Sequence, residues 1–136
     1  MEFQTVMGLA LDPEFTLRLR ESNRRHFERG FADDSIVVLL ARVGEELAGC
    51  VMLQEQIMIP NRPVPSGKIG LVLNMHVPEA FRRQGIAQAL MRAVEEEGRR
   101  RGLDRLDLKA TEMGEPLYRK LGWVDPWGGR PMEFSL

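Results

Sequence analysis

Residues His76–Glu96 read HVPEAFRRQGIAQALMRAVEE, and the organisation of the chain can be worked out from this segment. An arginine-rich turn with one central glycine, Gly85, precedes a run whose apolar residues recur at helical spacing. The first N–H groups of a helix lack partners within it, and the helix dipole adds positive charge, so phosphate is a natural ligand there. Gly85 permits close approach, and Arg82 and Arg83 can add charge-assisted contacts. Alone, the motif is weak, because glycine before a helix is also common in solvated turns.

The segments on either side of this turn alternate between strand and helix patterns. Asp12 and Pro13 predict the start of a first helix, with Phe15, Leu19 and Phe27 directed inward. Proline-rich residues 58–67 predict a long loop between two β-rich runs. The expected elements are helix 12–30, hairpin strands 35–43 and 47–57, strand 68–77, helix 85–101 closed by Gly102, strand 103–110, helix 114–122 and a last strand at 132–136.

This order predicts an α/β (α+β) fold with a mixed, mostly antiparallel central sheet flanked by helices. A chain of 136 residues, 43% hydrophobic and 29% charged, is expected to form a single domain over residues 1–136.

Composition excludes several classes of function. A net charge of −1 gives no general attraction to nucleic acid or anionic membranes, and no apolar run is long enough to span a bilayer. The single cysteine, Cys50, fits a reducing compartment, so a cytoplasmic location is expected. With His26 and His76 far apart in sequence, no metal site is predicted.

Two motifs with the right spacing and order resemble one enzyme superfamily. Arg82–Ala87 (RRQGIA) fits the Arg/Gln-x-x-Gly-x-Gly/Ala motif of the GCN5-related N-acetyltransferase (GNAT) superfamily, between a strand and a helix as in that family. Ala110–Val124 (ATEMGEPLYRKLGWV) resembles its later motif, in which a tyrosine precedes a leucine-glycine-aromatic end. The resemblance covers about Ser35 to Val124. The sequence differs from family members in two places. Its N-terminus has little room for the further strand and helix that they contain, and His76 stands where one bacterial subgroup more often has tyrosine.

The resemblance implies how acetyl-CoA would bind. Backbone donors of the turn would hold its pyrophosphate, and main-chain groups at the end of the preceding strand would pair with the pantetheine arm as if it were an added strand. The strand after the helix would splay away to leave that slot. The residues implicated are Met75, His76, Val77, Arg82, Arg83, Gln84, Gly85, Ile86, Ala87 and Tyr118.

The resemblance also gives Tyr118, the one tyrosine, a catalytic role. Its phenol would protonate the departing CoA sulfur, although a half-buried packing tyrosine is the commoner fate of this residue. Glu55 is the first candidate for the base that deprotonates the amine, and His76 and Glu112 are alternatives. Asn74 and Glu112 are candidate acceptor contacts, and Asn74 could instead be satisfied by neighbouring residues.

The expected function is therefore transfer of an acetyl group from acetyl-CoA to a primary amine by direct attack, with no metal. The acceptor is expected to be a small molecule, with loop 58–67 as a wall of its site. Alternatives are a non-catalytic acyl-CoA-binding module and a protein N-terminal acetyltransferase. The sequence has neither the Gly-Lys-Ser/Thr motif of a P-loop nor a Gly-x-Gly-x-x-Gly motif after a first strand, so a P-loop or dinucleotide-binding domain is excluded. The sequence is compatible with a homodimer.

Overall fold

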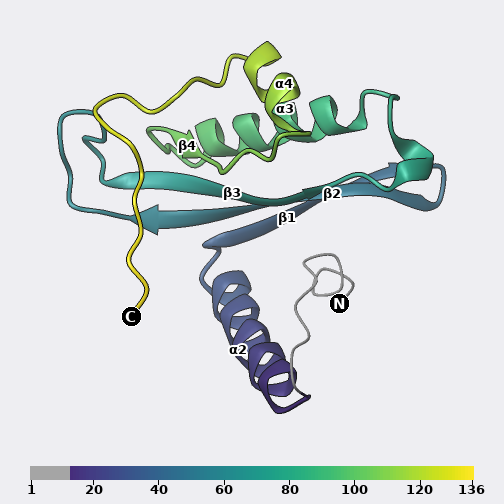
Figure 1. Ribbon diagram of the computed structural model, residues 1–136, viewed down its shortest axis with the longest axis horizontal. Helices are drawn as coiled ribbons and strands as arrows, with labels where there is room; N and C mark the ends of the chain where they lie inside the picture. The colour runs from purple at the N-terminus through teal and green to yellow at the C-terminus, as the bar shows by residue number, and fades with distance from the viewer. Residues whose placement is uncertain (1–12) are drawn as a thin grey trace.

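A mixed four-stranded sheet in the order β1-β2-β3-β4 organises residues 13–136, the part of the chain that the computed structural model describes. Helix α2 lies on one face of this sheet and α3 on the other, with α4 beyond α3 (Figure 1). This is the mixed sheet flanked by helices that the sequence predicts. The predicted N-cap Asp12 lies outside the described residues.

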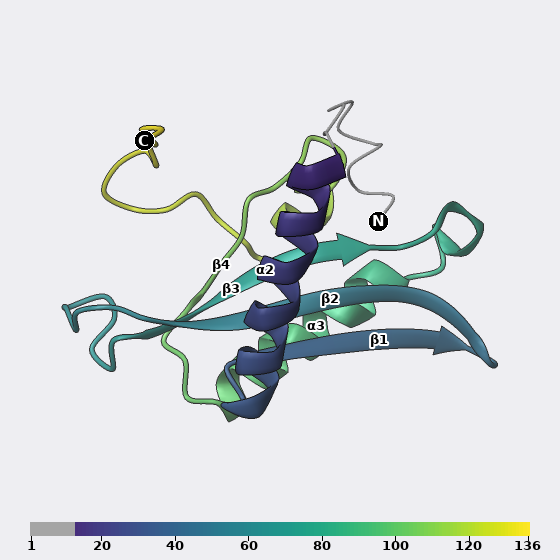
Figure 2. The ribbon, with the colours of Figure 1, turned by 90° about the horizontal axis from the view of Figure 1, so that it is seen from below.

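Three antiparallel strands form the main part of the sheet. β1 (Ile36–Val43) and β2 (Glu46–Ile57) form a hairpin, and β3 (Lys68–His76) pairs with the other edge of β2. Figure 2 shows the three strands side by side, with α2 crossing in front of them. The predicted hairpin, third strand and intervening loop are confirmed.

The core lies between the sheet and α3 (Ile86–Arg100). The helix repeat places its apolar residues on one side, where Leu90, Met91 and Val94 are buried. They pack against Val51, Leu53 and Val72 of the sheet and Leu121 after α4. The helix ends as predicted: Gly102 has a φ of 71°, and the N–H of Leu103 donates to the carbonyl of Gly98 at 3.0 Å.

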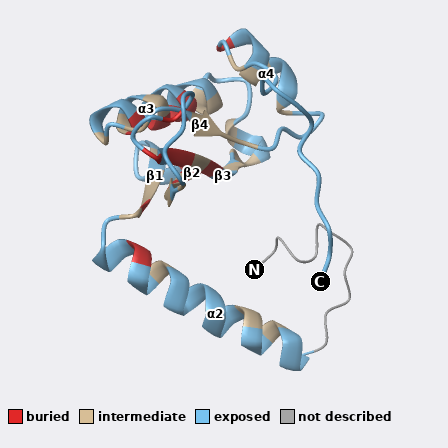
Figure 3. Cartoon of the chain, turned by 90° about the vertical axis from the view of Figure 1, so that its left-hand side faces the viewer, coloured by how far each residue is buried: buried red, intermediate tan, exposed pale blue. Residues whose placement is uncertain are grey.

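Helix α2 (Pro13–Ala32) packs less closely than the sequence predicts. Phe15 is 44% exposed, so its predicted inward position is wrong, whereas Leu19 and Phe27 are half-buried. Figure 3 shows an almost wholly exposed helix with a buried residue near its C-terminal end, which is Gly30. The physical reason is that only its C-terminal part approaches the sheet: a Cβ on Gly30 would lie 2.2 Å from Ile36 Cδ1.

The C-terminal part of the chain holds less strand than predicted. β4 comprises Leu106–Asp107 only, and the predicted last strand at 132–136 is wrong, because these residues form no regular structure. Proline at 126 and 131 removes two ladder donors, and Gly128 and Gly129 adopt positive φ. With only two residues of β4 to pair with, residues 123–136 run as coil after α4 (Glu115–Lys120; Figure 1).

Candidate acetyl-CoA and acceptor site

The turn before α3 is fixed by its own backbone and by Arg82. After the 3-10 helix η1 (Glu79–Phe81), Arg83 and Gly85 adopt left-handed conformations, with φ of 63° and 80°. Nε of Arg82 donates to the carbonyl of Val77 at 3.1 Å, which ties the turn to the end of β3. Gln84 between them does not have a positive φ, and residues of alternating handedness can turn backbone N–H groups toward one side, where an anion can bind.

The N-terminus of α3 is uncapped and exposed. Gly85 is its N-cap, and no side chain caps the helix. A Cβ built on Gly85 would meet no atom within 4 Å, so the space beside the turn is open. Residues 82–85 are exposed, while Ile86 and Ala87 are half-buried. The first N–H groups of the helix are thus available to a pyrophosphate, as the resemblance implies.

Strand β3 is irregular just before this turn. The β2–β3 register passes from Met52↔Leu73 to Cys50↔His76, so Asn74 and Met75 together oppose Val51 in a β-bulge. Asn74 has a φ of 53°, a conformation that a non-glycine residue seldom adopts. Its carbonyl accepts a weak hydrogen bond from Sγ of Cys50 at 3.7 Å. Bulges of this kind re-aim backbone and side-chain groups, and they cluster near functional sites.

Strands β3 and β4 part early, which leaves one side of β3 unpaired. Their parallel register covers Gly70↔Leu106 and Leu71↔Asp107, whereas β3 continues to His76. The main-chain groups at Met75 and His76 therefore lie beyond the paired region. An amide-bearing arm could pair with them as an extra strand.

Tyr118 of α4 faces a groove beside β4, which we call the β4 groove. This cavity of about 1130 Å³ is also lined by Leu71, Leu106, Leu108 and Trp123. The Tyr118 and Trp123 ring centroids are 6.3 Å apart. Burial raises the pKa of the Tyr118 phenol above its ordinary value of 10.0, so the hydroxyl keeps its proton at neutral pH.

The structure does not bring Glu55 to this site. Its Oε1 accepts a hydrogen bond from Nη1 of Arg101 at 3.1 Å, next to the C-terminal end of α3. Glu55 is opposite Gly70 in the β2–β3 register, well before the bulge. A carboxylate engaged in this way is better suited to holding α3 on the sheet than to accepting a proton from an amine.

The other candidate residues are dispersed. His76 is exposed at the end of β3, near the turn, and Glu112 is exposed in the turn before α4. Glu112 lines neither the β4 groove nor the second cavity, which lies between α2 and the sheet and includes Asn74. Loop 58–67 lies at the opposite end of β3, and its Pro63 lines the β4 groove.

The cavity between α2 and the sheet was missed by sequence reasoning. It includes Thr16, Arg20 and Asn23 of α2, together with Met52 and Leu73 of the sheet. The half-buried residues along one side of α2, Thr16, Leu19 and Phe27, indicate this cavity, but helical periodicity alone predicts that such residues pack in the core.

Two further observations concern the described residues alone. Within residues 13–136, no group of three or more His, Cys, Asp or Glu side chains is arranged to hold a metal ion. The helices in this range are not long and apolar enough to cross a membrane.

The sequence matches the model of the acetyltransferase (GNAT) family over residues 3–123. The chain therefore belongs to the GNAT family. Comparison with curated proteins gives no match.

Solved structures support the same fold. A GCN5-related N-acetyltransferase from Ralstonia eutropha is 30% identical, with a TM-score of 0.74 over 90% of this chain and 82% of the other. A predicted acetyltransferase from Clostridium acetobutylicum, solved with acetyl-CoA, is 19% identical, with a TM-score of 0.79 over 97% and 84%. A ribosomal-protein-alanine N-acetyltransferase from Brucella melitensis is 26% identical, with a TM-score of 0.58 over 75% and 73%.

Proposed function

We propose that this protein transfers the acetyl group of acetyl-CoA to a primary amine of a small molecule by direct attack. The observation that carries the proposal is the open, uncapped N-terminus of α3, with Gly85 in a left-handed conformation beside the unpaired end of β3. This geometry offers donors for a pyrophosphate and a strand edge for the amides of the pantetheine arm. Membership of the GNAT family and a structural neighbour solved with acetyl-CoA support this choice of donor.

The binding roles follow from the turn and from β3. Backbone groups of residues 82–87 would hold the pyrophosphate, and those of residues 75–77 would pair with the pantetheine arm. The guanidinium of Arg83 adds positive charge next to the phosphates, whereas Arg82 also braces the turn through Val77.

The chemical step forms a C–N bond and breaks a C–S bond. The neutral amine attacks the thioester carbonyl carbon, and the electron pair of the broken bond passes to sulfur. Tyr118, protonated because its pKa is raised, would donate to that sulfur and regain a proton from solvent. The proton that the amine loses balances the one that the thiol gains. We propose that solvent, rather than Glu55, accepts the amine proton, because Glu55 is bound to Arg101.

Two glycines at opposite ends of α3 provide a matched test of cofactor binding. Gly85 and Gly102 both have positive φ, and a Cβ at either meets no atom within 4 Å. Gly85→Asp places a negative charge in the proposed phosphate site, whereas Gly102→Asp places the same charge at the other end of the helix. Calorimetric titration with acetyl-CoA should show binding weakened at least ~10-fold by Gly85→Asp, about one charge-assisted hydrogen bond, and unchanged by Gly102→Asp. Equal effects of the two substitutions would refute the site.

Turnover separates this proposal from a non-catalytic acyl-CoA-binding module. Free-thiol release from acetyl-CoA should require an amine, and binding without release for any amine would favour the module.

A protein N-terminal acetyltransferase is the second alternative, and one neighbour is a ribosomal-protein-alanine N-acetyltransferase. Turnover of N-terminal peptides but not of small amines would favour it. With its single cysteine, the protein is proposed to act in the cytoplasm.

A further inference from the structure

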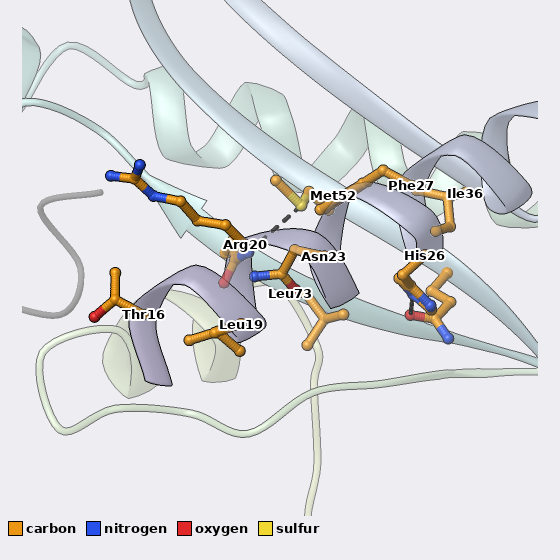
Figure 4. Close-up of a pocket in the computed structure, with 11 residues that line it drawn as sticks. Thr16, Leu19, Arg20, Asn23, His26, Phe27, Ile36, Met52 and Leu73 are labelled. Carbon is orange, nitrogen blue, oxygen red and sulfur yellow. Dashed lines mark hydrogen bonds between the residues drawn. The ribbon is translucent and has the colours of Figure 1, made fainter. Parts of the chain in front are cut away.

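A groove between α2 and the sheet lies beside the bulge of β3, and we call it the α2 groove. Its volume is about 580 Å³, within the range of small-molecule sites. Figure 4 shows its lining side chains, which come from one side of α2 and from β1, β2 and β3. The lining residues are Thr16, Leu19, Arg20, Asn23, His26, Phe27, Ile36, Met52, Gln54, Leu73 and Asn74.

The α2 groove adjoins the part of β3 that is proposed to bind the pantetheine arm. Leu73 and Asn74 directly precede the residues proposed to pair with the pantetheine arm. Asn74 is the bulged residue with positive φ, and its Nδ2 lies 3.4 Å from Sδ of Met52. The bulge therefore belongs to both the proposed cofactor slot and the wall of the α2 groove.

The charge of the α2 groove restricts the acceptor. Among the described residues that line it, none is an aspartate or glutamate, and Arg20 carries the formal positive charge. An acceptor with several ammonium groups would find no carboxylate in this lining to pair with them, and the charge of Arg20 would repel them. A carboxylate on the acceptor would instead be attracted to Arg20.

The two ends of the α2 groove differ in polarity. Figure 4 shows Thr16 and Arg20 toward one end and Phe27 and Ile36 toward the other, with Met52 and Leu73 between them. Arg20 and Phe27 are seven residues apart on α2, which corresponds to about 10 Å along the helix. A guanidinium carries five N–H donors, so it can bind a carboxylate in addition to another partner.

We infer that the acceptor is a monoamine bearing one carboxylate and an apolar group, of the class of the apolar α-amino acids. Its carboxylate binds Arg20, its apolar side chain points toward Leu73 and Phe27, and its amine meets the thioester beside Asn74. This inference rests on the proposed acetyltransferase function, and it narrows the substrate of that site.

The test measures free-thiol release with L-phenylalanine, L-leucine and L-methionine, the amides of the same amino acids, spermidine and kanamycin. The three acids should have kcat/KM values at least ~10-fold above their amides, because the amides lack the charged partner of Arg20. Spermidine and kanamycin should be poor acceptors. Preference for either of these cations, equal use of acids and amides, or turnover of none of the panel would overturn the inference.

Arg20→Gln should lower kcat/KM for the acids at least ~10-fold and leave the values for the amides nearly unchanged. Arg24→Gln is the matched control: Arg24 is also on α2, forms an exposed pair with Glu28 at 3.7 Å and does not line the groove. Equal losses for acids and amides, or equal effects of Arg20→Gln and Arg24→Gln, would contradict the assignment. Calorimetry of the wild-type protein with acetyl-CoA separates failure of this inference from failure of the proposed function. If the wild type binds acetyl-CoA but prefers cationic amines, only the acceptor class is refuted. If the wild type does not bind acetyl-CoA, the proposed function is refuted.

Discussion

Glu55→Gln distinguishes a structural role of Glu55 from a catalytic one. The side chain of Arg101 is 6% exposed and that of Glu55 is 26% exposed, with 3.1 Å between Nη1 and Oε1. Glu97 also accepts from Nε of Arg101 at 2.8 Å, and Asp34 accepts from Nη2 at 3.1 Å. Arg101 thereby connects the end of α3 to Glu55 of β2 and to Asp34, which lies just before β1.

The expected loss of stability follows from what glutamine retains. Its amide oxygen can still accept from Arg101, so a charge-assisted hydrogen bond becomes a neutral one, which costs about 1 to 1.5 kcal/mol of the free energy of unfolding. The larger loss of about 3 to 5 kcal/mol for an unpaired buried charge does not apply, because Glu97 and Asp34 still neutralise Arg101. For a domain of this size, the loss corresponds to a fall in Tm of about 3 to 6 °C.

The assay combines thermal unfolding with steady-state acetylation of the best amine of the panel. Glu96→Gln is the matched control, because Glu96 and Arg99 form an exposed pair at 3.2 Å on α3, the helix that Arg101 directly follows. An exposed pair contributes at most about 1 kcal/mol and often nothing, so Tm should change by about 3 °C or less. Glu55→Gln should lower Tm and leave kcat unchanged. A fall in kcat of about 10²-fold or more, with Tm equal to that of the control, would refute the structural role and identify Glu55 as the base.

Three further predictions address the tyrosine, the ion pairs and the core. Tyr118→Phe keeps the ring packing and should lower kcat by about 10²-fold with acetyl-CoA affinity unchanged. Because burial raises the pKa of Tyr118, kcat of the wild type should fall at alkaline pH only above pH 10.0. A fall in kcat near neutral pH would contradict the role of Tyr118 as the acid. Hydrogen bonds from Arg100 and Arg101 lower the pKa of Glu97 below its ordinary 4.5, so its stabilisation is present above that pH and is lost as pH falls through the lowered value; urea unfolding should show wild type and Glu97→Gln differing most at neutral pH and converging in acid. Met91→Ala, at a fully buried position, should reduce the free energy of unfolding by about 2 to 5 kcal/mol, whereas Met113→Ala, at an 80% exposed position, should change it by less than about 0.5 kcal/mol in the same measurement.

Local patterns predicted most of the elements. The alternation of β-rich runs around a glycine turn predicted the β1–β2 hairpin, and the apolar repeat of residues 86–94 predicted the buried face of α3. Both depend on residues close together in sequence. The predicted last strand at 132–136 does not form, because it has no long neighbouring edge to pair with: β4 comprises only two residues.

The sequence by itself indicated the family and the glycine turn before α3, because the spacing of Arg82 to Ala87 between a strand and a helix sets their backbone geometry locally. Only the tertiary structure placed Glu55 against Arg101 and brought the residues of the α2 groove together. Glu55 and Arg101 are 46 residues apart, and the α2 groove joins residue 16 to residue 74. Such contacts depend on how α2 and α3 pack on the two faces of the sheet, and no local periodicity encodes that packing.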